Sequence, residues 1–260
     1  MIKLIKNLKP YKIAVLTLLL VLVVQAFGDI SIPSYMQKII DTGIQNKGIE
    51  HIIPSKVKED EYREAQIFMN DGEKRLWASA YKKDGGTYTL VTKDEKKLSK
   101  LDSKLLKPIV LSYQLGHMTV RQFKKTVKEQ LSARPETKAI TARIDDMSIS
   151  EIANLMKVDI KPFKSKNQSG KLHTYVDMRP MIETQIANGQ MDKSTINKSK
   201  SDMDKTISSV GDRTLKSMGI AYATSASEAA GVNVDRVQKT YLWDTALKMM
   251  LVTVVMISAA

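Results

Sequence analysis

The sequence predicts a mainly α-helical protein in which two transmembrane helices, the second one truncated, flank a mostly helical extracellular domain with a small β element. Three observations support this fold class. An apolar block lies near each end of the 260-residue chain, the region between the blocks is basic, and its apolar residues recur mostly at helical spacing. We expect an elbow helix and the first transmembrane helix in residues 1–46, the extracellular domain in 47–238 and the start of the second transmembrane helix in 239–260.

The N-terminal block has the length and the flanking charge of a membrane span. Residues 13–37 contain one charged side chain, and as a helix they would extend about 37 Å, which exceeds the roughly 30 Å hydrocarbon core of a bilayer. Positive flanks stay on the cytoplasmic side, so we expect a cytoplasmic N-terminus. A short helix lying on the membrane surface, closed by Pro10, precedes the span. The expected interface anchors on this flank are Lys3, Lys6, Lys9 and Lys12.

The C-terminal block stays apolar to its last residue. Its charged residues, Asp244 and Lys248, both lie near its start. Tyr241 and Trp243 lie where an interfacial aromatic belt is expected, and the Lys248 ammonium can extend to the membrane surface. Because a membrane helix normally ends in a polar flank, we expect the chain to be a piece of a longer protein. A buried core helix or a tail anchor is the alternative.

The region between the blocks is predicted to be helical with one strand. The whole chain has 41 Lys and Arg against 28 Asp and Glu, a net charge of +13. The strand is expected at 87–91 and loops at 161–171, with either a loop or a solvated helix at 188–204. Helices are expected over 59–69, 73–81, 120–131 and from 207 onward. Thr92 and Glu95 are expected to form the capping box of a further helix, which ends or kinks at Pro108. Ser148 or Ser150 is expected to begin another helix.

Composition and motifs exclude several kinds of chemistry. The chain has no cysteine, which excludes a disulfide scaffold, a thiolate metal site and a cysteine nucleophile. His51, His117 and His173 are far apart in sequence, and the signatures of phosphate loops, zinc proteases and serine hydrolases are missing. We therefore predict no catalytic residue, metal ligand or cofactor site in these residues.

The positive charge has two interpretations. Bases are interspersed with acids and aromatic residues are only 6% of the chain, so nucleic acid is not the expected partner. An external basic domain would instead contact anionic cell-wall polymer or lipid head groups. The alternative is that the charge only keeps the surface soluble.

A polar stripe is predicted within the first span. Gln25, Asp29 and Pro33 follow one another at four-residue spacing, which places them on one helix face. A carboxylate at membrane depth is costly and usually faces a water-filled cavity or a partner. Pro33 leaves the carbonyl of Asp29 without its helical hydrogen bond and is expected to kink the helix. We predict that the stripe lines a substrate path, unless Asp29 already lies at the outer interface and is solvated.

Both ends of the chain resemble one family. Leu8-Lys-Pro-Tyr11, Ile32-Pro33-Ser-Tyr-Met36 and Ile39-Ile-Asp-Thr-Gly-Ile44 are similar to the elbow and first helix of the transmembrane domain of type I ABC exporters. Tyr241-Leu-Trp-Asp-Thr-Ala-Leu-Lys-Met-Met250 is similar to the start of that family's second helix. The resemblance covers about residues 1–50 and 233–260. Most of the family joins these helices by a short loop, whereas a subset of multidrug-type exporters carries a large helical extracellular domain there, as expected here.

The resemblance implies a multi-pass plasma-membrane subunit that drives multidrug, lipid or peptide efflux by alternating access. It implies a second exporter subunit as partner, in a homodimer or a heterodimer. ATP and Mg²⁺ would bind a nucleotide-binding domain that these residues do not contain, so no ATP site is carried over. Two alternatives remain open. One is a secreted or membrane-tethered binding protein whose signal peptide is cleaved after Ala26, and the other is a two-span sensor with an external ligand domain.

Overall fold

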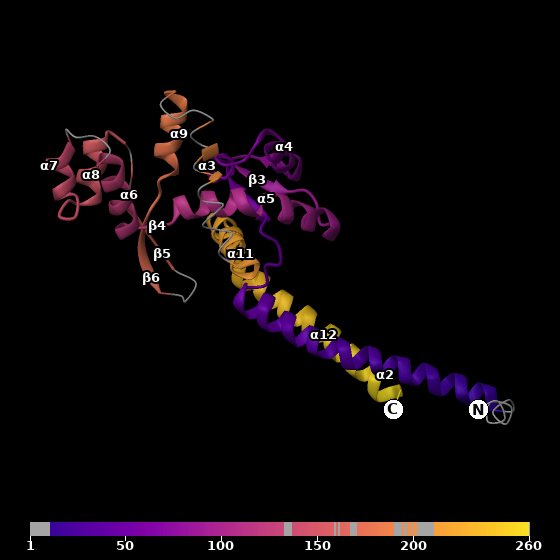
Figure 1. Ribbon diagram of the computed structural model, residues 1–260. Helices are drawn as coiled ribbons and strands as arrows, with labels where there is room; N and C mark the ends of the chain where they lie inside the picture. Colours follow the sequence, from indigo (N-terminus) through magenta and orange to yellow (C-terminus); the bar gives the residue numbers. More distant parts are fainter. Residues whose placement is uncertain are drawn as a thin grey trace. The chain divides into compact units, whose positions relative to one another are not determined.

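The computed structural model forms two compact units (Figure 1). Unit 1 comprises Met1–Glu50 and Asn233–Ala260, and unit 2 comprises His51–Val232. The boundaries expected from the sequence are 46/47 and 238/239. The structure describes residues 11–132, 137–158, 160, 162–166, 171–189, 194, 197–198, 200–201 and 211–259.

Unit 1 is a pair of long antiparallel helices. Helix α2 (Lys12–Lys38) continues into a π-helical segment, η2 (Ile39–Gln45), and helix α12 (Val234–Ala259) packs along both. Both helices are long and apolar enough to span a membrane, and only 6% of the most apolar window of each is buried. The predicted fold class is confirmed, since two such helices flank a mainly helical domain with a small β content. Helix α2 runs on through Pro33, and the π-helical residues begin only at Ile39.

Two glycines let the helices of unit 1 approach closely. A Cβ atom on Gly28 would lie 1.9 Å from Sδ of Met256, and one on Gly43 would lie 2.4 Å from Cδ2 of Leu242. Both glycines are buried, and the carbonyl of Gly43 also accepts a hydrogen bond from Nε2 of Gln238 at 2.8 Å. Small residues at points of close approach are typical of helix pairs in membranes.

Unit 2 contains the other helices that the structure describes and two small antiparallel sheets (Figure 1). The strands are ordered β1-β3-β2 in the first sheet and β4-β6-β5 in the second. The strands are β1 (Lys56–Lys58), β2 (Tyr81–Asp84), β3 (Thr87–Leu90), β4 (Met118–Thr119), β5 (Pro162–Lys166) and β6 (Leu172–Val176). The helices are α3 (Glu59–Glu64), α4 (Asp71–Ala80), α5 (Glu95–Gly116), α6 (Val120–Ser132), α7 (Lys138–Arg143), α8 (Ile149–Met156), α9 (Arg179–Ala187) and α11 (Asp212–Ala229).

Some local predictions for unit 2 are confirmed and others are wrong. Ser148 caps α8 in a capping box with Glu151, as one of the two expected alternatives. Thr92 does not cap α5. Asp94 does so instead, because its carboxylate accepts hydrogen bonds from the N–H groups of the first helical turn. Helix α5 also continues through Pro108, which is buried within it.

The predicted loop at 161–171 is wrong in part. Residues 162–166 form strand β5, in which Phe163 pairs with Tyr175 of β6. The sequence of this stretch lacks the polar–apolar alternation of a half-buried strand, so it does not predict one. The strand is stabilised by its hydrogen bonds to β6. The expected helix at 59–69 ends earlier, since α3 stops at Glu64. Most of 188–204 lies outside the described residues.

Two clusters of buried apolar residues in unit 2 differ in their relation to helix α5. One cluster contains Phe68 and Leu215 together with Val110 and Leu111 of α5 itself. The other is formed by the elements that follow α5 in sequence, and its fully buried members include Phe123, Val127, Ile144, Ile152 and Val176. Helix α5 therefore connects two parts of the unit, and the residues near Gly116 lie where the chain passes from one to the other.

Candidate functional site

The three residues of the polar stripe lie on helix α2 in unit 1. Gln25 is half-buried, whereas Asp29 and Pro33 are exposed. The Asp29 carboxylate makes no hydrogen bond or ion pair with any residue that the structure describes. Its neighbour Gly28 packs against α12, so Asp29 itself is directed away from the closest contact of the helix pair.

Asp29 lies at membrane depth if helix α2 spans a bilayer. From Lys12 to Asp29 the helix rises about 25 Å, so a hydrocarbon core of about 30 Å that begins after Lys12 still includes Asp29. The contact of Gly28 with Met256 puts Asp29 level with the apolar end of α12. Lys248, the nearest basic residue along α12, is eight residues or about 12 Å closer to the start of that helix. An unpaired carboxylate at this level requires water or a polar partner.

The predicted interface anchors are placed in part. Lys12 and Lys248 are exposed, and Trp243 is 77% exposed. Tyr241 is half-buried, and its hydroxyl donates a hydrogen bond to Oε1 of Glu50 at 3.1 Å. Lys3, Lys6 and Lys9 lie outside the described residues.

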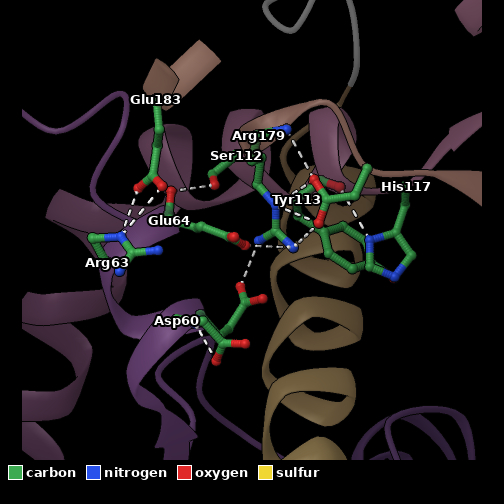
Figure 2. Close-up of polar contacts among 10 residues, drawn as sticks. Asp60, Arg63, Glu64, Ser112, Tyr113, His117, Arg179 and Glu183 are labelled. Carbon is green, nitrogen blue, oxygen red and sulfur yellow. Dashed lines mark hydrogen bonds and ion pairs between the residues drawn. The ribbon is translucent and has the colours of Figure 1, made fainter. Parts of the chain in front are cut away.

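A second candidate site lies in unit 2 and was missed by the sequence analysis. It is a buried guanidinium surrounded by three carboxylates (Figure 2). Arg179, the first residue of α9, is only 4% exposed. Its Nε and NH2 atoms donate to both carboxylate oxygens of Asp177, with a shortest distance of 2.7 Å. Its NH1 atom donates to Oε1 of Glu61 at 2.7 Å, and NH2 lies 3.2 Å from Oε2 of Glu64.

This cluster is formed by three parts of the chain that meet at the C-terminal end of α5. Helix α3 supplies Glu61 and Glu64, and Ser112 of α5 donates a hydrogen bond to the carbonyl of Glu64 at 2.8 Å. A Cβ atom on Gly116 would lie 2.6 Å from Nε of Arg179, so a larger residue there would displace the guanidinium from its carboxylates. The guanidinium thus passes directly over the end of α5 and joins α3 to the start of α9.

The cluster is set to hold a proton near neutral pH. Burial raises the pKa of Glu64 to about 7, against the opposing effect of Arg179 and with the neighbouring carboxylates Asp177 and Glu61 adding to the rise. Charge repulsion among carboxylates that share one cation is relieved when one of them is protonated. Burial of Glu64 therefore favours one proton on the cluster between acidic and neutral pH.

An aromatic cluster lies beside this site. The ring of His117 is 4.1 Å from that of Tyr113, and Phe163 and Tyr175 lie 5.4 and 5.6 Å away. Burial lowers the pKa of His117 to about 4, and the nearby Arg179 adds to this effect. Burial also raises the pKa of Tyr113 to about 12. Neither side chain changes its charge near pH 7, so both contribute packing to the site (Figure 2).

A histidine between two carboxylates links the first residues of unit 2 to α5. Nδ1 of His51 lies 2.8 Å from Asp102 and Nε2 lies 3.2 Å from Glu95. Asp102 also accepts a hydrogen bond from the N–H of Ile52 at 3.0 Å. The hydrogen bond to Asp102 raises the pKa of His51 above its ordinary value, against the opposing effect of burial.

No catalytic constellation connects these groups among the residues that the structure describes. The guanidinium of Arg179 is already surrounded by carboxylates, and the His117 ring is enclosed by aromatic side chains. Comparison of the chain with protein families, with curated proteins and with solved structures finds no match.

Proposed function

We propose that the chain is a segment of an ATP-driven membrane exporter subunit. In this proposal unit 1 provides the first transmembrane helix and the start of the second, and unit 2 is an extracellular domain. The observation that carries the proposal is the pairing within unit 1. The two segments that resemble type I ABC exporters, about 1–50 and 233–260, are the two that pack together, although unit 2 separates them in sequence.

The polar stripe has a role in this proposal. Asp29 lies on a face of α2 that α12 leaves uncovered, and it has no partner among the described residues. In an exporter that face would meet further helices, a second subunit or the substrate path. The proposal further requires a cytoplasmic N-terminus, a second subunit, and ATP and Mg²⁺ bound in a nucleotide-binding domain outside these residues.

A tethered or secreted binding protein is the second candidate. It requires cleavage of a signal peptide after Ala26. One observation favours a retained helix instead. Helix α2 runs unbroken from Lys12 to Lys38, so Ala26 lies within a regular helix. N-terminal sequencing of the mature protein separates the two, because a new N-terminus at Phe27 is expected only for the binding protein.

The experiment that tests the exporter proposal uses the full-length gene product in its membrane. Asp29→Leu removes the carboxylate, and Ile30→Leu changes the adjacent exposed apolar residue as a matched control. We expect Asp29→Leu to lower efflux and substrate-stimulated ATP turnover and Ile30→Leu to leave both unchanged. Wild-type efflux and ATP turnover in Asp29→Leu would rule out a role for the stripe. Absence of any nucleotide hydrolysis by the wild-type protein would rule out the exporter itself.

A further inference from the structure

One face of helix α5 in unit 2 carries five exposed lysines and no acid, and the last of them, Lys107, already has a partner. Lys96, Lys97, Lys100 and Lys104 are all exposed. At 100° per residue they lie within about 100° of one another around the helix axis, and they extend about 12 Å along it. We call these four residues the α5 lysine face.

The opposite face of α5 is buried in the core of unit 2. Leu98, Leu101 and Leu105 are 6%, 6% and 0% exposed. The helix is therefore held with its lysines directed toward solvent. It also has no free apolar face with which to enter a bilayer, as an amphipathic helix on a membrane surface does.

The acidic residues of this helix are already engaged elsewhere. Asp94 accepts hydrogen bonds from the first turn as the N-cap, and both Glu95 and Asp102 contact His51. The four lysines, in contrast, form no ion pair with any residue in the described part of the chain. Lys96, Lys100 and Lys104 follow one another at four-residue spacing, at which like charges repel. The row is therefore a concentrated positive charge, which an external anion would neutralise.

We propose that the α5 lysine face docks a linear phosphate polymer. The lysines lie in a row along one helix instead of being spread over several elements, which fits a chain of anions better than a planar membrane. No aromatic side chain lies on this face, so it has no platform on which nucleic-acid bases could stack. Lysine binds phosphate as a compact point charge, and the binding free energy comes mainly from released counterions.

Binding of inorganic polyphosphate to the full chain in neutral detergent tests the proposal. The double variant Lys100→Gln/Lys104→Gln removes two charges from the face. The control Lys125→Gln/Lys138→Gln removes two exposed lysines from α6 and α7, so the net charge of both variants is the same. Glutamine has nearly the helix propensity of lysine, and circular dichroism verifies that the helical content is unchanged.

We expect the face variant to bind polyphosphate about tenfold more weakly and the control to stay within about twofold of wild type. The slope of log K against log salt should fall by about 1.4 in the face variant, because each lysine contributes about 0.7 for a single-stranded polyanion. Lys100→Arg/Lys104→Arg, which keeps the charge, should bind as wild type does.

Three results would overturn the proposal. Equal loss in the face variant and the control would mean that binding follows net charge alone. Wild-type affinity in the face variant would place the polymer elsewhere. Binding to phosphatidylglycerol vesicles that depends on the two lysines, without binding of the soluble polymer, would assign the face to a membrane surface.

Discussion

Replacement of Arg179 by methionine would leave three carboxylates without their cation, of which Glu64 is buried and Glu61 and Asp177 are half-buried. Glu61, Glu64 and Asp177 each lie within 3.2 Å of the guanidinium, whose side chain is 5% exposed. Removing one partner of a buried ion pair typically costs about 3–5 kcal/mol, because the remaining charge stays desolvated. Domains are stable by about 5–15 kcal/mol, so Arg179→Met should remove a large part of the stability of unit 2.

Arg63 provides a matched control for this variant. Its Nε also donates to a glutamate, Glu183, at 3.0 Å, but its side chain is 64% exposed. Exposed ion pairs contribute about 0–1 kcal/mol. Arg63→Met therefore removes the same type of group from a similar contact at a much lower cost.

The assay is urea unfolding of the full chain in detergent, followed by the fluorescence of Trp77. Trp77 is fully buried in α4, and its indole N–H donates to the carbonyl of Tyr62 at 3.2 Å, so it reports on α3. Trp243→Phe removes the only other tryptophan. The reasoning is refuted if Arg179→Met and Arg63→Met lower the free energy of unfolding equally, or if Arg179→Met lowers it by less than about 1 kcal/mol.

Two further predictions concern pH. The folded state holds a proton on Glu64 up to about pH 7, whereas the unfolded chain releases it near pH 4.5, so stability should fall by about 3 kcal/mol as the pH rises through this range. Glu64→Gln should remove that fall, which unfolding at pH 5 and pH 8 would reveal; an unchanged fall contradicts the assignment. Asp102→Asn should lower the pKa of His51, measured by NMR titration of its ring, because the carboxylate is the main cause of the raised value. In the wild-type protein the stabilisation by His51 is complete below the pKa of the unfolded chain and disappears as the pH rises through the raised pKa of the folded state. At acidic pH the variant should therefore be less stable than wild type. Equal pKa values of His51 in the variant and in wild type would contradict this prediction.

Local signals in the sequence predicted part of this structure. The long apolar runs near the two ends predict helices α2 and α12, because an apolar stretch of about 20 residues indicates a membrane-spanning helix more strongly than the helix propensities of its single residues do. The cap of α8 at Ser148 follows from a four-residue pattern. Asp29 could be singled out because a charge inside an apolar run is conspicuous, but the sequence could not show that its carboxylate has no partner among the described residues of unit 1.

The buried charge cluster could not be predicted in the same way. Glu61 and Arg179 are 118 residues apart, and the residues around Glu61 have the composition of a solvated charged helix. Only the tertiary fold brings them together and excludes water. Strand β5 was missed for a related reason, since its pairing with β6 depends on a partner strand and not on its own pattern.

The sidedness of unit 2 is the most direct test of the exporter account. The chain contains no cysteine, so single substitutions give unique labels for a membrane-impermeant maleimide. Ala78→Cys places a thiol on an exposed position of unit 2, and Val23→Cys places one on the apolar surface of α2, at a side chain that is 68% exposed. In intact cells that make the full-length protein, the account predicts labelling of Ala78→Cys and no labelling of Val23→Cys. Labelling of Ala78→Cys only after the cells are lysed would contradict it.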